Sequence, residues 1–254
     1  MNKKQLWLVI GGFILIQIFY FGFDTVQLDK EGEVAGGDEV AMDHAWDDHL
    51  DEALAELSDE DRDTINAWMS RAEEQDVVAR KQLASFWVSK SEWELGGHYL
   101  EEIAKSSPTT ENLSTAARTY ATGAQQMEDE LHRTFLRQKA LSLYDQAVEE
   151  GAGFQVELDK TLFLIKMPDD QNPMQGVLAL VDLSKKYPQE PEVFVQLGRF
   201  SIQTGQWDKA LERLLQAYEL DPDRKETNCL LSSVYKEMGD ADKSAEFSRR
   251  CENN

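Results

Sequence analysis

The fold of this chain follows from the stretch Phe194–Pro222, which reads FVQLGRFSIQTGQWDKALERLLQAYELDP. Gly198 and Ala210 are small residues at the two points where a pair of antiparallel helices would cross closely. Gly205 lies between them and provides the turn, because glycine adopts a left-handed backbone conformation without a steric penalty. Pro222 then ends the second helix. The stretch therefore predicts one complete helix–turn–helix unit.

With its flanks, residues 191–224, this unit resembles the tetratricopeptide repeat (TPR), a helical hairpin of about 34 residues. The residues that match the family pattern are Leu197, Gly198, Gly205, Trp207, Ala210, Leu214, Ala217 and Pro222. Ser201 departs from the pattern, since the family prefers a large apolar residue there. The resemblance implies an all-α solenoid of stacked hairpins that binds other proteins.

The repeat length extends along the rest of the chain. We expect repeats at 77–110, 111–156, 157–190 and 191–224, followed by a capping repeat at 225–254. The second unit is longer than the family repeat, and its unbroken helical periodicity indicates extra helical turns on both arms. The last unit carries polar residues at apolar family positions, which is typical of terminal solenoid repeats because nothing stacks on them.

The third repeat is interrupted within its first helix. Pro168 ends that helix early, and we expect a loop at 169–171 before the second helix begins. Asn172 is the expected N-cap and Pro173 the expected first helical residue. The loop is either a functional feature or a family-specific break without a function.

The N-terminal segment Leu6–Phe23 is an 18-residue run in which only Gln17 is polar. A helix of this length spans about 27 Å, close to the bilayer core of about 30 Å. Lys3 and Lys4 precede the run and Asp24 follows it, so the positive-inside rule predicts a cytoplasmic N-terminus and an exported remainder. A cleaved signal peptide and a buried soluble helix are the alternatives, although the run is longer than usual for a signal.

The chain is thus expected to contain a cytoplasmic stub (1–5), a transmembrane anchor (6–23), an acidic tether with a short amphipathic helix (24–57) and a TPR-like domain (58–254). This layout resembles bacterial inner-membrane TPR proteins, namely the ancillary subunit of the Sec translocon and the proteins that hold apocytochrome c. The resemblance implies a single-pass protein of the bacterial inner membrane whose TPR domain is periplasmic.

Charge excludes one class of partner. The formal net charge is −22, and residues 24–63 hold 16 acidic side chains against Lys30 and Arg62. Binding to nucleic acid requires Lys and Arg against the phosphates, so we expect no nucleic-acid partner. Within this segment, apolar spacing predicts a helix at Ala45–Leu57 and a second at Asp59–Gln75.

Enzymatic motifs are absent from the sequence. It has no nucleophile elbow, phosphate-binding loop, dinucleotide glycine motif or paired-cysteine motif. His44 and His49 lie among aspartates, but their spacing places the two rings about 140° apart on a helix, which disfavours a shared metal. We therefore expect no catalytic residues, metal, cofactor or small-molecule substrate. A metal-dependent or hydrolytic enzyme in the acidic segment is the alternative from another class.

Cys229 and Cys251 both belong to the last repeat. The family geometry that the resemblance implies places the first on the concave face and the second on the packing face, so we expect two unpaired thiols. A single bridge remains the alternative in an oxidising compartment.

The resemblance also implies where a partner binds, because first helices line the concave face of TPR stacks and take a peptide there. The residues at these positions are Glu192, Val195, Arg199, Ile202, Gln203, Glu226, Cys229, Ser233, Lys236, Lys81, Ser85 and Val88. Their charged members are either contacts for acidic groups or merely solvated. The expected function is that of a membrane-anchored scaffold or chaperone-like adaptor for a protein or peptide, with a structural subunit of an envelope complex as the alternative.

Overall fold

The computed structural model describes residues 38–253, which form twelve α-helices and no strand beyond an isolated bridge. The predicted all-α class is confirmed for this part of the chain. The chain divides into two compact units, residues 1–56 and 57–254. In the first unit the structure describes helix α2 (Asp38–Ala55), which begins well before the predicted start at Ala45.

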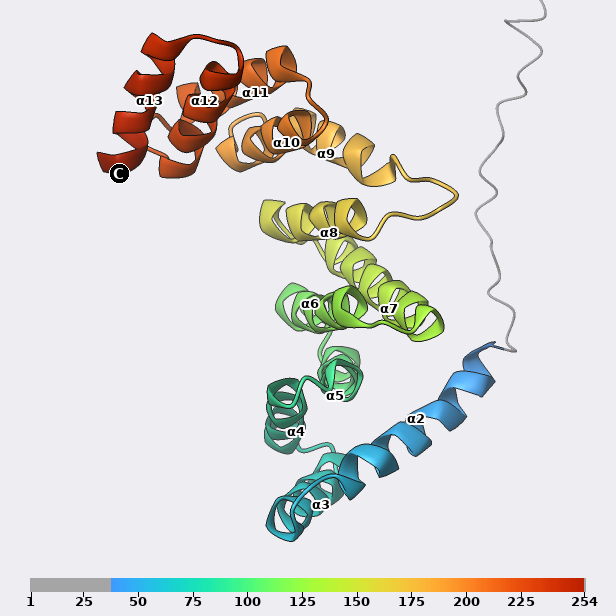
Figure 1. Cartoon of the computed structure of the whole chain (residues 1–254). Helices are drawn as coiled ribbons and strands as arrows, with labels where there is room; N and C mark the ends of the chain where they lie inside the picture. Colours follow the sequence, from blue (N-terminus) through green and yellow to red (C-terminus); the bar gives the residue numbers. More distant parts are fainter. Residues whose placement is uncertain (1–37, 254) are drawn as a thin grey trace, which may run out of the picture. The chain divides into compact units, whose positions relative to one another are not determined.

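The second unit is a series of helices that lie side by side in chain order (Figure 1). Their bounds are α3 Asp59–Glu73, α4 Val77–Ser89, α5 Trp93–Ser106, α6 Thr110–Gln126, α7 Glu130–Glu149, α8 Phe154–Lys166, α9 Gln175–Lys186, α10 Pro191–Gln203, α11 Trp207–Leu220, α12 Lys225–Glu237 and α13 Ala241–Asn253. From α4 onward they form five hairpins. Three of the hairpins fall within the expected repeats 77–110, 191–224 and 225–254, whereas α6 and α8 begin before the expected boundaries at 111 and 157.

Among the described helices, none is both long and apolar enough to cross a membrane. The predicted anchor at 6–23 lies outside the described residues, as do the stub and residues 24–37 of the predicted tether. The anchor therefore stays a prediction from the sequence.

The last two hairpins turn in the same way. Gly205 and Gly239 follow the first helix of their hairpins with φ angles of 69° and 82°. The residue after each donates its N–H back to the helix, from Gln206 to the Ser201 carbonyl and from Asp240 to the Tyr235 carbonyl. These bonds satisfy carbonyls that would otherwise be unpaired at the helix end.

The second hairpin is extended as expected. Helices α6 and α7 have 17 and 20 residues, whereas α4 and α5 have 13 and 14. The interruption at Pro168 is also present, between the end of α8 at Lys166 and the start of α9 at Gln175. The predicted cap at Asn172 is wrong, because α9 begins later and Met174 occupies the N-cap position without a side-chain bond. Asn172 instead pairs with Asp169 in a tight turn.

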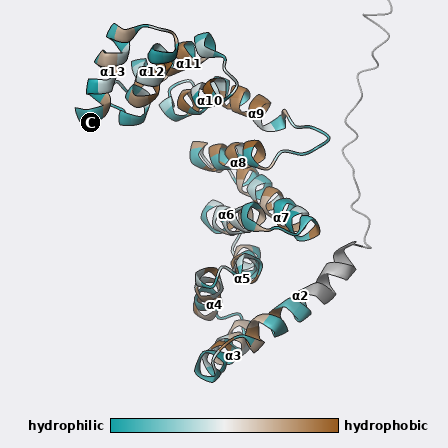
Figure 2. Cartoon of the chain, in the orientation of Figure 1, coloured by the Kyte–Doolittle hydropathy of each residue, from teal (hydrophilic) through white to brown (hydrophobic). Residues whose placement is uncertain are grey.

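The core runs between the helices of each hairpin, where small residues permit close crossing. A Cβ on Gly198 would lie 2.7 Å from Leu214 of α11, so the helices cross closely at this glycine, as predicted. A Cβ on Gly176 would lie 2.6 Å from the backbone nitrogen of Ile165, so α9 approaches the backbone of α8 directly. Both of these helices carry several hydrophobic turns (Figure 2).

Candidate partner-binding surface

Three of the four charged residues predicted to bind a partner on α10 and α12 form ion pairs, and the fourth, Lys236, forms none within the described residues. Arg199 Nε donates to Glu226 Oε1 over 2.7 Å. Arg224, at the N-cap of α12, forms an ion pair with Glu192 on α10 and lies 3.4 Å from the second oxygen of Glu226. Glu192, Arg199 and Glu226 therefore link successive first helices, which reduces their availability to a partner.

The prediction that Val195 lies on the partner-binding surface is wrong. Its side chain is 0% exposed, so it belongs to the core and cannot contact a partner. The reason is that α10 packs against α9, α11 and α12, and three neighbours bury more of a helix than the repeat pattern allows for. Ile202 is half-buried against the core of the last two hairpins, and Gln203 remains exposed.

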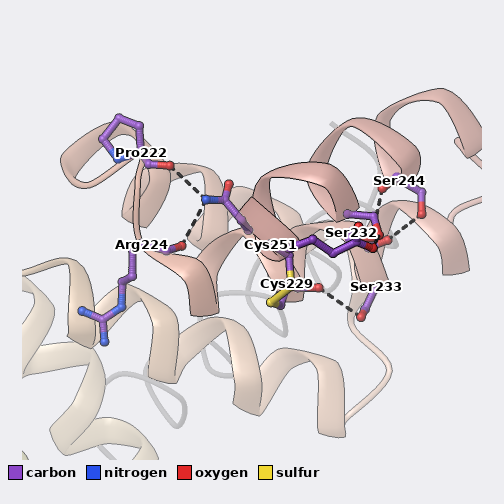
Figure 3. The surroundings of a disulfide bond; sticks show 10 residues. Pro222, Arg224, Cys229, Ser232, Ser233, Ser244 and Cys251 are labelled. Carbon is purple, nitrogen blue, oxygen red and sulfur yellow. Dashed lines mark hydrogen bonds between the residues drawn. A yellow bond between two sulfur atoms is a disulfide. The ribbon is translucent and has the colours of Figure 1, made fainter. Parts of the chain in front are cut away.

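The cysteines of the last hairpin form a disulfide, so the expectation of two free thiols is wrong (Figure 3). The Cα atoms of Cys229 and Cys251 are 4.9 Å apart, within the range that a disulfide requires. The two residues thus face one another across α12 and α13 instead of lying on different faces. Ser233 and Lys236 stay exposed on α12, and the Ser233 hydroxyl donates to the Cys229 carbonyl over 3.2 Å.

The polar residues of this hairpin also have a structural explanation. Ser232 Oγ donates to the Ser244 carbonyl over 2.9 Å, and Ser244 Oγ donates to the Ser232 carbonyl over 3.0 Å. This reciprocal pair joins α12 to α13 (Figure 3). The covalent bond and the hydroxyl pair together compensate for the small apolar content of α13.

Helices α6 and α8 repeat the pattern of paired charges. Arg118 Nε on α6 donates to Asp159 Oδ2 on α8 over 2.7 Å, and Gln155 holds the second oxygen of that carboxylate at 2.8 Å. First helices of neighbouring hairpins are thus joined by ion pairs in two places along the second unit.

Helix α4 differs, because its exposed side chains border a groove. The groove has a volume of 470 Å³ and is lined by Trp68 from α3 and by Val78, Lys81, Gln82, Ser85 and Phe86 from α4. Two of the three residues predicted on this helix, Lys81 and Ser85, line it. The third, Val88, is half-buried against α5, where it packs on Gly96.

Hydrogen bonds and an ion pair at the connection between α3 and α4 fix the two helices that line the groove. Asp76 caps α4 by accepting the N–H groups of Val78 and Ala79 over 2.8 and 3.2 Å. Arg71 donates to the same carboxylate, and its side-chain hydrogen bond is the largest cause that lowers the pKa of Asp76. Arg80 donates across to the Ala72 carbonyl over 3.3 Å. The crossing of the two helices is therefore fixed on both sides.

The groove combines apolar residues with two polar side chains. Val78 is 60% exposed, while Trp68 and Phe86 are half-buried. Lys81 is exposed and forms no ion pair with any residue that the structure describes. The side-chain oxygen of Gln82 is buried and accepts no hydrogen bond within residues 38–253. Binding sites typically pair an apolar lining with a few such polar groups.

Sequence reasoning did not identify Trp68, Gln82 or Phe86 as site residues. The repeat pattern starts at 77 and so excludes α3, which supplies Trp68. A usable signal was present, because the apolar face predicted for that helix contained a tryptophan that no repeat position required. Gln82 follows the predicted residue Lys81, and Phe86 follows Ser85. They line the groove because α3 packs against α4 there, which the repeat pattern does not indicate.

A buried carboxylate elsewhere belongs to the framework. Glu101 on α5 accepts a hydrogen bond from the Tyr120 hydroxyl over 2.9 Å and from Lys139 over 3.2 Å, and Lys105 lies 3.3 Å away. Burial raises the pKa of Glu101, but Lys139, Lys105 and the Tyr120 hydroxyl outweigh it, so the net shift is downward. The ionised carboxylate joins three helices.

A second carboxylate, Glu94, is buried at the start of α5. It lies 2.9 Å from Nε2 of His132, which is on α7. This contact fastens the long hairpin to the preceding one. The His44 side chain is outside the described residues, so the structure does not test the predicted acidic face around it.

Comparison with known proteins identifies the last hairpin. The family described as "Tetratricopeptide repeat" matches residues 226–253. The last hairpin is thus similar to a tetratricopeptide repeat. The match falls one repeat later than the stretch Phe194–Pro222, and it contains both cysteines. The TPR match and the all-α hairpins give the chain the architecture of a protein-interaction scaffold.

Among solved structures, the chain is similar to MamA from residue 41 to its end, from Desulfovibrio magneticus RS-1. The sequence identity is 17% and the TM-score 0.48, over 70% of this chain and 93% of that one. Two further MamA crystal structures share 14% identity, with TM-scores of 0.47 and 0.48; they cover 69% and 67% of this chain and 89% and 93% of their own. A search of curated proteins finds no match.

Proposed function

We propose that this protein is a membrane-anchored, TPR-like scaffold that binds a segment of a partner protein in the groove between α3 and α4. The groove carries the proposal. It lies on the helix face where a partner was expected, and it offers exposed apolar surface at Val78 beside Lys81, a cation without an ion pair among the described residues. On α10 and α12, the predicted contact residues Glu192, Arg199 and Glu226 are already paired. We expect no catalytic activity.

The proposed location is outside the cytoplasm, with the segment 6–23 in the bilayer. Two independent features support it. Lys3 and Lys4 precede the apolar run and Asp24 follows it, as the positive-inside rule requires of a cytoplasmic N-terminus. The Cys229–Cys251 disulfide is typical of an oxidising compartment, since cytoplasmic thiols are kept reduced.

Photo-crosslinking in intact membranes tests the binding site. A photoreactive amino acid replaces Ser85 in the groove, and in a matched variant it replaces Gln203, which is exposed on α10. We expect a protein adduct from the groove position and a much weaker one from the other. A partner captured only from position 203 would move the site to the C-terminal hairpins, and no adduct from either position would contradict the proposed function.

Topology requires its own measurement. A reporter that is active only outside the cytoplasm, fused after Asn254, is expected to be active, and the fusion should remain in the membrane fraction after a carbonate wash. Removing residues 1–23 should abolish both results. An active cytoplasmic reporter in the same place would overturn the proposed orientation.

A second candidate function, a structural subunit of an envelope complex, is favoured by one observation. Met174 and Leu178 lie one turn apart at the start of α9 and are 50% and 58% exposed, next to the turn at Asp169. Neighbouring exposed apolar side chains can form part of a contact surface for another protein. A partner recovered in stoichiometric amount through this surface would support the subunit; many partners recovered in small amounts through the groove would support the adaptor.

A further inference from the structure

We infer that helix α13 is a redox-controlled lid, which the Cys229–Cys251 disulfide holds closed over α11 and α12 and which a dithiol releases by reducing that bond. This lid is separate from the proposed function, because it belongs to the C-terminal hairpin and not to the groove between α3 and α4. It depends on three features of the hairpin, namely the small apolar content of α13, the aromatic rings that α13 covers and the position of the disulfide.

Helix α13 contributes little apolar surface to the core. Phe247 is its one buried side chain, and its half-buried residues are Ser244, Ser248 and Cys251. By contrast, the second helix of the preceding hairpin, α11, buries three apolar residues: Ala210, Leu214 and Ala217. Helices in proteins are held mainly by the packing of an apolar face. The noncovalent hold on α13 is therefore weaker than the hold on α11.

The surface beneath α13 is aromatic. Phe247 stacks on Tyr235 of α12 with ring centres 5.5 Å apart, and it meets Tyr218 of α11 edge-to-face at 5.4 Å. Two cations of α13, Lys243 and Arg250, lie over the same rings, at 5.0 Å from the centre of Tyr235 and 5.7 Å from that of Tyr218. Cation–π contacts of exposed side chains are individually weak. Release of α13 would therefore expose both tyrosine rings.

The disulfide closes the open end of the hairpin. Cys229 lies near the start of α12 and Cys251 near the end of α13, whereas the turn at Gly239 joins the two helices at their other ends. The hydroxyl pair of Ser232 and Ser244 lies between the bridge and the turn (Figure 3). Without the bridge, only the turn would tie α13 covalently to α12, and chain ends open most readily. Reduction therefore frees the C-terminal end of α13 first.

The release step is thiol–disulfide exchange. A thiolate of the dithiol attacks one sulfur of the bond, which forms a mixed disulfide and expels the other cysteine as a thiolate. The second thiol of the reductant then attacks the mixed disulfide, so the dithiol ends as a disulfide and Cys229 and Cys251 end as two thiols. Two electrons and two protons thus pass to the cysteine pair. Both cysteines are half-buried, so a dithiol can reach the bond without unfolding α12.

Hydrogen exchange of the full chain in detergent tests the lid, with dithiothreitol as the dithiol and mass spectrometry of peptides as the readout. Complete reduction should speed amide exchange in α13 by on the order of tenfold to a hundredfold, because the loop between the cysteines loses its chain-entropy stabilisation. The peptides of α13 should change more than those of α11, which has no covalent link to lose. Unchanged exchange in α13 after complete reduction would overturn the inference.

A cysteine-free variant, Cys229→Ser with Cys251→Ser, assigns the effect to the disulfide. Its exchange in α13 should match that of the reduced parent and should not respond to dithiothreitol. Hydroxyl-radical footprinting should label Tyr218 and Tyr235 of this variant more strongly than those of the oxidised parent, whereas Tyr99, buried in α5, should stay protected. If the first two tyrosines stay protected as well, α13 remains closed without the bond and the lid is contradicted.

Phe247→Ala separates the disulfide from packing. In the oxidised chain this variant should speed exchange in α13 less than reduction does, because the bond still holds the end of the helix. Ala245→Ser is the matched control, since this residue is exposed on the same helix, and it should leave exchange unchanged. If Phe247→Ala opens α13 in the oxidised chain as far as reduction opens the parent, packing holds the helix and the redox control is wrong.

Discussion

At the scale of single residues, the backbone at Ser91 is strained, whereas the hairpins that turn at Gly205 and Gly239 avoid this strain. Ser91 has a φ angle of 66° and occupies the place that Gly205 and Gly239 occupy in later hairpins. It is followed by the same bond, from the Glu92 N–H to the Trp87 carbonyl. A side chain in this left-handed region costs roughly 1–2 kcal/mol, which glycine does not incur.

Ser91→Gly should therefore raise the free energy of unfolding by about 1 kcal/mol. Urea denaturation followed by circular dichroism measures it. The reverse change, Gly205→Ser, should lower stability by a similar amount because it introduces the same strain. A Ser91→Gly variant that is less stable than the parent would mean that the hydroxyl stabilises the turn.

Glu101 predicts a specific pH dependence. Its pKa in the folded protein lies below the usual 4.5, so its contribution to stability is complete above that value and is lost as the pH falls through the folded pKa. The difference in melting temperature between the parent and Glu101→Gln should shrink on acidification below about pH 4.5. Glu212→Gln, on the exposed face of α11, is the control. A difference that stays constant with pH would exclude the ionised carboxylate as the cause.

At the scale of the helices, the crossing of α8 and α9 depends on Gly176. An added Cβ would meet the Ile165 backbone nitrogen at 2.6 Å, and backbone cannot move aside as a side chain can. Gly176→Ala should cost about 1–3 kcal/mol, measured by thermal unfolding. Gly153→Ala is a matched control, because a Cβ there meets nothing within 4 Å and its φ is ordinary. Equal losses in the two variants would show that the crossing does not decide stability.

The disulfide predicts a local effect of reduction. It closes a loop between residues 22 positions apart, which corresponds to about 3 kcal/mol in the chain-entropy account. Replacing Cys229 and Cys251 by serine should increase hydrogen exchange in α13 and leave α4 and α5 unchanged, since solenoid repeats stabilise mainly their neighbours. Exchange that rises equally in every hairpin would contradict this independence.

At the scale of the molecule, glycine and proline positions in the sequence predicted the hairpins well, but the sequence predicted the partner-binding surface poorly. Gly205, Gly239 and Pro168 act on their own backbone, so the sequence shows where helices end. The binding surface depends instead on which residues meet across helices. Neither the pairing of Arg199 with Glu226 nor the contribution of Trp68 to the groove follows from repeat positions, and Val195 is buried by neighbours that those positions do not count.

The ion pairs between successive first helices have a mechanical consequence. Arg118 with Asp159 and Arg199 with Glu226 oppose the separation of neighbouring hairpins on one side of the stack, whereas packing opposes it elsewhere. Exposed pairs weaken with salt and packing does not. The bending stiffness of the solenoid should therefore fall as ionic strength rises, and the protein would be more compliant in a salty medium at unchanged helix content.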